Sequence, residues 1–161
     1  MNPLSLNQAM DIILKYQTKL PINILAIAHE FKIKVYSTKD WPTSLSGQII
    51  KDEARGGESG YAIFVNALHK IVRQRFTIAH ELAHFILHRA NIGDGITDDA
   101  LYRSGLSNRE EAMANQLAAD ILMPWHLINL VMDQGKNDIP ELAASFHVSE
   151  TAMSIRLGIP C

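Results

Sequence analysis

The stretch Arg73–His88, RQRFTIAHELAHFILH, decides the fold, because the pentad H-E-L-A-H at positions 80–84 lies in a region without helix breakers. No Gly or Pro occurs from position 67 to position 88, so the sequence predicts one long helix. Residues four apart lie on one helix face about 6 Å from each other. His80 and His84 are therefore expected to bind one zinc ion.

Glu81 lies next to this histidine face, where its carboxylate can accept a proton from a metal-bound water and pass it to the leaving amine. The opposite face carries Ile78, Leu82 and Phe85. We expect that face to enter the core while the histidine face lines a cleft. The pentad thus predicts a zinc-dependent peptidase with Glu81 as the catalytic base.

A third protein ligand is needed if one zinc position is left for water. The extended pattern H-E-x-x-H-x-x-G-x-x-H is absent, because Leu87 and Ala90 stand where its glycine and third histidine would be. His88 lies about 12 Å along the helix from His80, too far to share the metal. We expect His88 to cap the helix C-terminus or to hydrogen-bond a ligand.

The third ligand is therefore expected to be a carboxylate from a later segment, and the candidates are Asp94, Asp98, Asp99, Glu110, Glu111 and Asp120. The segment 107–122 reads as a helix capped by Ser107 or Asn108, and its alanines allow close approach to the pentad helix. Glu111 shares a face with Asn115 and Ala118, whereas Glu110 is turned about 100° away. Glu111 completes a thermolysin-like His, His, Glu set.

The remaining segments predict an α+β fold that is mainly helical. Helices are expected at Leu4–Tyr16, Ile22–Phe31, Ala67–His88 with Asn66 as its cap, Leu127–Met132 and Ile139–Ile159. Short β-prone runs at Ile33–Ser37, Gln48–Lys51 and Tyr61–Asn66 predict a small antiparallel sheet. Asn91–Ser107 reads as a long surface loop.

Composition restricts the class of protein. The 161 residues are 47% apolar, which is enough for residues 1–161 to form a single domain with its own core. The formal net charge of −2 is scattered, so direct nucleic-acid binding is not expected. Cys161 is the single cysteine, which fits a reducing compartment, and no window is long enough to cross a bilayer. A cytoplasmic location with no membrane partner is expected.

Two blocks resemble the ImmA/IrrE family of bacterial and phage metallopeptidases. Arg75–His88 is similar to the family block R-F-T-x-A-H-E-L-x-H-x-x-L-H, and Glu111–Pro124 resembles E-x-E-A-N-x-F-A-A-x-L-L-M-P. Met113 and Leu117 depart from the second block, but its first glutamate is retained as Glu111. The resemblance covers about residues 10–157. It implies a zincin-like domain and, as substrate or partner, an Xre-type helix-turn-helix regulator encoded nearby.

Other interpretations remain open at this point. Residues 139–158 resemble a helix-turn-helix, which would suit a DNA-associated regulator, but Arg156 is the lone basic side chain of its second helix, so a packing role is favoured. A zinc-binding toxin or interaction protein, acting without proteolysis, is another alternative. The group that stabilises the oxyanion is not decided among Tyr61, His69, Arg73, Tyr102 and His126.

Overall fold

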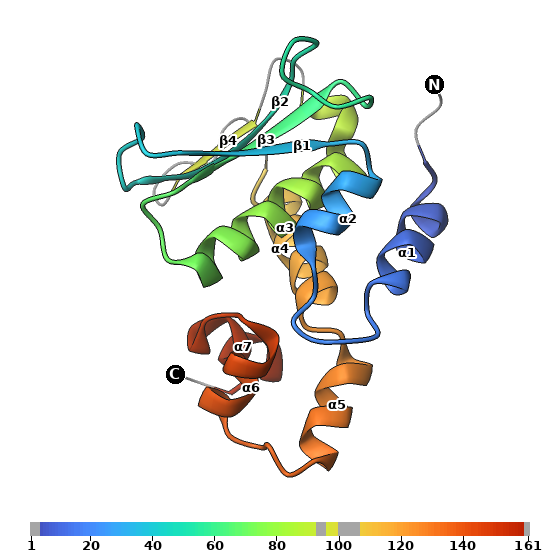
Figure 1. Cartoon of the computed structure of the whole chain (residues 1–161), viewed down its shortest axis with the longest axis vertical. Helices are drawn as coiled ribbons and strands as arrows, with labels where there is room; N and C mark the ends of the chain where they lie inside the picture. Colours follow the sequence, from blue (N-terminus) through green and yellow to red (C-terminus); the bar gives the residue numbers. More distant parts are fainter. Residues whose placement is uncertain (1–3, 93–95, 100–106, 160–161) are drawn as a thin grey trace.

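A four-stranded sheet lies across one end of the molecule, with helix α3 directly beneath it (Figure 1). The computed structural model describes residues 4–92, the backbone of 96–99, and 107–159. The strand order is β1-β3-β2-β4, with bounds β1 Lys34–Thr38, β2 Leu45–Lys51, β3 Tyr61–Asn66 and β4 Ile96–Asp99.

The sheet is mixed, so the expectation of a purely antiparallel sheet is wrong in one pairing. β2 pairs antiparallel with β3 and with β4, whereas β1 pairs parallel with β3. An alternating apolar pattern assigns a strand to one face of a sheet but not to a direction of pairing. β4 also forms within the segment predicted as a loop, of which 93–95 and 100–106 lie outside the described residues.

Helix α3, Ile71–His88, is the centre of the fold. It begins four residues later than predicted because Asn66 does not cap it. The Asn66 side chain instead donates to the carbonyl oxygens of Pro42 and Leu45 and accepts from the backbone N–H of Leu68. These bonds hold the turn between β3 and α3, and Lys70 occupies the N-cap position without a side-chain hydrogen bond.

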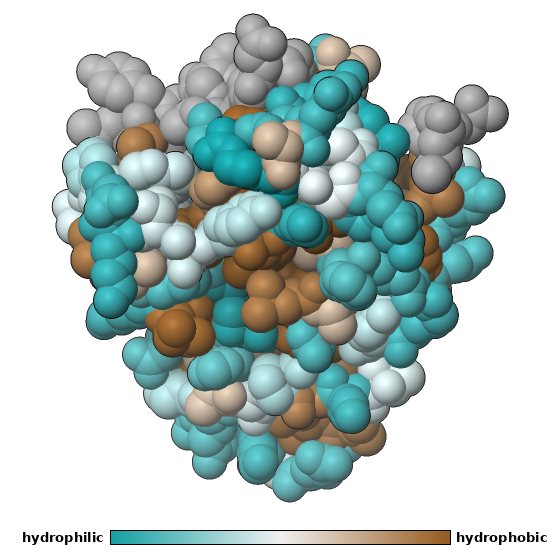
Figure 2. Space-filling model, turned by 45° about the horizontal axis from the view of Figure 1, so that its top comes forward, coloured by the Kyte–Doolittle hydropathy of each residue, from teal (hydrophilic) through white to brown (hydrophobic). Residues whose placement is uncertain are grey.

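Helices α1, Leu6–Lys15, and α2, Ile24–Glu30, contact one another and α3 (Figure 1). Both are shorter than predicted, because Ser5 and Asn23 cap them by accepting backbone N–H groups. Their buried residues join those of the sheet and α3 in one hydrophobic core, in which Ile49 and Ile63 of the sheet are fully buried. Figure 2 shows that polar side chains cover much of one face and that apolar ones are exposed in a hollow between them.

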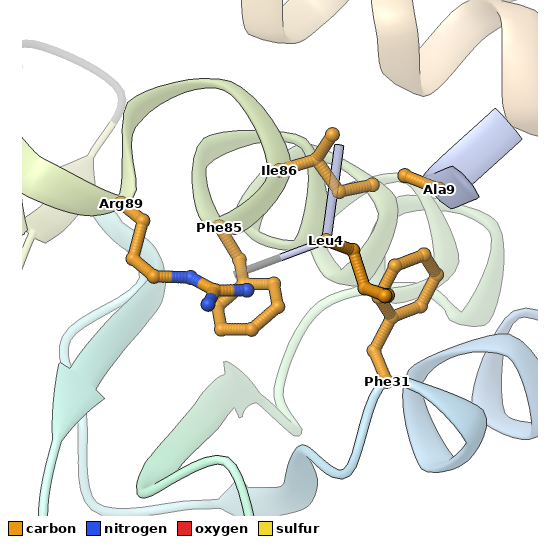
Figure 3. Close-up of a pocket in the computed structure, with 6 residues that line it drawn as sticks. All are labelled: Leu4, Ala9, Phe31, Phe85, Ile86 and Arg89. Carbon is orange, nitrogen blue, oxygen red and sulfur yellow. The ribbon is translucent and has the colours of Figure 1, made fainter. Parts of the chain in front are cut away.

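The C-terminal end of α3 is closed by an apolar cluster around Arg89 (Figure 3). A 3-10 turn, η1 Arg89–Asn91, follows the helix, and the Arg89 guanidinium lies 3.7 Å from the centroid of the Phe85 ring. Leu4, Ala9, Phe31 and Ile86 line the rest of a 40 Å³ cavity there. Burial lowers the pKa of Arg89. The cluster attaches the N-terminal segment to α3.

Helix α4, Asn108–Leu122, packs against α3 as predicted. Ser107 caps it, and the pair forms a capping box: the Ser107 hydroxyl accepts the N–H of Glu110 at 3.2 Å, while a Glu110 carboxylate oxygen lies 3.3 Å from the N–H of Ser107. The cap therefore fixes the first turn of the helix that carries Glu111.

Ser107→Ala is expected to lower the free energy of unfolding by about 1 kcal/mol, because the N–H of Glu110 loses its acceptor. Urea denaturation measures the change. Ser107→Asp is the matched control, since aspartate also caps helices, and it should stay close to wild type. Equal losses in both variants would contradict a capping role.

The last three helices are α5 Trp125–Asp133, α6 Ile139–Phe146 and α7 Glu150–Leu157. α6 and α7 lie in the segment 139–158 and contact each other, and Ser149 caps α7. Arg156 is committed to internal contacts: it forms an ion pair with Asp120 at 2.8 Å, donates to the carbonyl oxygen of Met123 at 3.0 Å and lies over the Trp125 ring. These contacts favour the packing role over DNA binding.

Candidate metal centre

The pentad places two histidines on the face of α3 that meets α4. His84 is fully buried, and the His80 side chain is 11% exposed. Their Nε2 atoms lie 3.1 Å apart. The predicted helical stacking of the two imidazoles is thus present in the structure.

Glu111 of α4 lies opposite these histidines. Its two carboxylate oxygens lie 3.1 Å from Nε2 of His80 and 3.3 Å from Nε2 of His84. The capping box and the small alanines of α4 bring this carboxylate to α3, and Ala114 and Ala118 are fully buried between the helices. Within the described residues, His80, His84 and Glu111 form a cluster that can hold a metal ion.

The spacing of the three donors suits zinc. Two ligands each about 2.0–2.1 Å from a tetrahedral metal are separated by roughly 3.3 Å. The two Nε2 atoms are 3.1 Å apart, close to this value, and Glu111 presents one carboxylate oxygen to each of them, at 3.1 and 3.3 Å. Two imidazole nitrogens and one carboxylate oxygen also form a common zinc ligand set. The residues present therefore fit the ion that the sequence predicts.

Glu81 is fully buried on α3 next to the cluster. Strand β2 packs against α3, and its residue Gly47 lies close to Glu81. A Cβ atom at Gly47 would overlap the Thr77 methyl and would lie 3.4 Å from a carboxylate oxygen of Glu81. The register shift between β2 and β4 occurs at this same place, between Leu45 and Gly47. The absence of a side chain at position 47 lets the sheet close over Glu81.

Gly47→Ala is expected to cost about 1–3 kcal/mol of stability and to lower the peptidase activity that the pentad predicts, because the new methyl displaces Thr77, which lies one helical turn before Glu81. Thermal unfolding and initial hydrolysis rates measure both effects. Thr77→Ser removes the methyl in conflict, so Gly47→Ala/Thr77→Ser should recover much of the loss. Losses that simply add in the double variant would show that the overlap is not the cause.

His88 lies within hydrogen-bonding distance of His84 and is not part of the cluster of His80, His84 and Glu111. Its Nδ1 lies 3.0 Å from Nδ1 of His84, on the side of that ring opposite Glu111. Burial lowers the pKa of His88, and the nearby His84 adds to the effect. A neutral His88 can accept the Nδ1 proton of His84 and fix the orientation of that ring.

The other carboxylate candidates either bond elsewhere or lie outside the side chains that the structure describes. Glu110 accepts from Asn91 and joins the capping box, and its pKa is lowered by the backbone N–H of Ser107 and by these side chains. Asp120 pairs with Arg156. Asp94 lies outside the described residues, and for Asp98 and Asp99 only the backbone is described.

Four of the five candidates for oxyanion stabilisation lie within the described residues. His69 and Arg73 line a groove between α3, α4 and α7, one helical turn from the cluster. Tyr61 packs against the Phe85 ring, and His126 contacts the carbonyl oxygen of Gln17, so neither takes part in that groove. Tyr102 lies outside the described residues.

A buried His, His, Glu cluster on two packed helices, with a glutamate following the first histidine, defines a metallopeptidase-type site. The chain belongs to the peptidase M78 family, since residues 28–158 match its IrrE N-terminal-like domain. This match confirms the family that the two sequence blocks resemble. No curated protein matches the chain.

A solved structure of a Mycobacterium tuberculosis transcriptional regulator is similar to this chain, with a TM-score of 0.63 and 17% sequence identity. The similarity covers 96% of this chain but 46% of that protein, so this chain spans about half of the regulator's length. At this identity the likeness concerns the fold alone. No helix within the described residues has both the length and the apolar character to span a membrane.

Proposed function

We propose that this chain is a zinc-dependent endopeptidase, with His80, His84 and Glu111 as metal ligands and Glu81 as the catalytic base. The observation that carries the proposal is the approach of Glu111 to both histidine Nε2 atoms, at 3.1 and 3.3 Å, beside the fully buried Glu81. Membership of a metallopeptidase family supports it. Zinc held by these residues supplies a Lewis acid that activates water and polarises the scissile carbonyl.

Glu81 and His88 are proposed to have different roles in hydrolysis. Glu81 accepts a proton from the attacking water and delivers it to the leaving amine. His88 holds the His84 ring through the 3.0 Å Nδ1 contact, and burial of the whole cluster strengthens each electrostatic interaction. The thermolysin-like assignment follows from the His, His, Glu set alone.

The proposed substrate is an Xre-type transcriptional regulator encoded nearby, and the proposed location is the cytoplasm. The family resemblance supports this choice, and the structural neighbour is itself described as a transcriptional regulator. Residues 1–161 are proposed to act as one peptidase domain that includes the α6–α7 pair. Direct DNA recognition by that pair is disfavoured, because Arg156 is paired with Asp120.

Metal analysis combined with a cleavage assay tests the function. We expect about one zinc per purified chain, cleavage of the neighbouring regulator detected by mass spectrometry, loss of cleavage with a chelator and its return with added zinc. Stable binding of the regulator without cleavage, in the zinc-loaded protein, would favour the interaction protein instead. A chain that binds no zinc would remove the basis of the proposal.

A further inference from the structure

A groove of about 880 Å³ runs between α3, α4 and α7. Ala112, Gln116 and Ala119 of α4 line it together with residues from the start of α3 and from α7. In Figure 1, α7 lies below the start of α3. The groove is therefore built by three helices that are distant in sequence.

The groove lies one helical turn from the metal centre along both α3 and α4. Phe76, which lines it, precedes His80 by one helical turn, and Asn115, which also lines it, follows Glu111 by one turn. His80 is the member of the cluster with a partly exposed side chain, at 11%, whereas His84 and Glu111 are buried. A chain lying in the groove therefore needs to extend past Phe76 and Asn115 by about one helical turn to reach His80.

The groove has large apolar side chains that no described residue covers. Ile155 of α7 is 73% exposed and Leu68, just before α3, is 53% exposed. Val72 and Phe76 of α3 add further apolar surface between them. Apolar groups gathered in a concave surface next to a reaction centre indicate a binding site for apolar side chains.

The lysine and arginine side chains that line the groove make it positively charged. Lys70 and Arg73 line it and are exposed, and among the described residues neither has a carboxylate partner. Arg73 donates to the neutral hydroxyl of Ser46 at 3.0 Å. None of the residues that line the groove is acidic, and the first turn of α3 contains no acidic residue either. The third cation in the groove, Arg156, is paired with Asp120. The start of α3 therefore attracts a negatively charged group.

From these observations we infer that the groove binds the substrate as an extended segment, with an apolar residue against Phe76 nearest the scissile bond and an acidic residue, among further apolar ones, farther along. The inference rests on the proposed peptidase function and specifies its substrate class. Arg73 and Lys70 precede His80 by seven and ten residues, which corresponds to roughly 10 and 15 Å along the helix axis. Extended chain advances about 3.3 Å per residue, so the acidic side chain lies about three to five residues from the scissile bond.

Fluorescence anisotropy with the zinc-loaded Glu81→Gln protein tests the inference without turnover. The probes are fluorescein-labelled ten-residue peptides of Leu, Ala and Ser that carry two Glu at the N-terminal or C-terminal end, with matched peptides carrying Lys or Gln instead. We expect one of the Glu peptides to bind at least about tenfold more tightly than its Lys counterpart. Arg73→Glu should abolish or reverse this preference, and Ala112→Phe, which fills the groove, should weaken all of the peptides.

Lys136→Glu is the matched control, because it makes the same change of charge at an exposed position outside the groove. It should leave the preference intact.

Equal binding of Glu and Lys peptides, an unchanged preference in Arg73→Glu, or no binding at millimolar peptide would overturn the inference. Cleavage of the regulator with unchanged rates in Arg73→Glu and Ala112→Phe would retain the peptidase and reject the groove. If the wild-type protein binds peptides with this charge preference but hydrolyses none of them, the groove is retained as a binding site and the peptidase function is rejected.

Discussion

Replacing Glu81 with Gln is expected to reduce peptide hydrolysis by about two to four orders of magnitude while leaving the zinc content at the wild-type level. The amide cannot accept the proton of the attacking water, so general-base catalysis is lost. The change preserves the size of a side chain that is fully buried under β2, so the fold should survive. Parallel measurements of hydrolysis rate and zinc content by elemental analysis separate the two effects.

The Glu81→Gln result distinguishes a peptidase from a zinc-binding interaction protein. If the variant keeps its zinc and still acts on the regulator as well as wild type, proton transfer by Glu81 is not part of the function. The interaction protein would then be the better description. If the variant loses its zinc, Glu81 contributes to metal binding in addition to, or in place of, catalysis.

Glu111→Ala is expected to weaken zinc binding by more than about a hundredfold and to abolish hydrolysis. Loss of a group that merely orients a ligand costs about 10–100-fold in metal affinity, and loss of the ligand itself should cost more. Competition with a chromophoric chelator measures the zinc affinity directly. Far-ultraviolet circular dichroism checks that both helices remain folded.

The adjacent Glu110 supplies the matched control. Its carboxylate bonds to Asn91 and Ser107 and lies on a different face of α4. Glu110→Ala removes the same chemical group one residue away and should keep its zinc, although the helix cap becomes weaker. Equal loss of zinc from both variants would mean that the approach of Glu111 to the histidines does not reflect metal binding.

The face of each helix that contributes to the cluster could be predicted from the sequence because helical geometry is local. A spacing of four residues places His80 and His84 on one face, and the 100° rotation per residue separates Glu111 from Glu110. Ser107 could be predicted as a helix cap because capping also depends on neighbouring residues alone. Each of these inferences needs only a dozen neighbouring residues.

Features that depend on distant segments were not predicted. The parallel pairing of β1 with β3 requires β3 to lie between β1 and β2, which no local pattern encodes. The start of α3 was misplaced because Asn66 bonds to Pro42 and Leu45, more than twenty residues earlier. The groove likewise forms only when α7 comes to lie near α3 and α4.

The proposed ligands come from two separate helices, two from α3 and one from α4, so a bound ion would be a cross-link through the middle of the molecule. An ion that binds the folded chain alone adds about 2.7 kcal/mol of stability when its free concentration is a hundred times its dissociation constant. The lifetime of the protein in a cell, and not just its activity, would then follow the supply of zinc. Starvation for the metal would leave more chain accessible to degradation, and repletion would restore its abundance without new transcription.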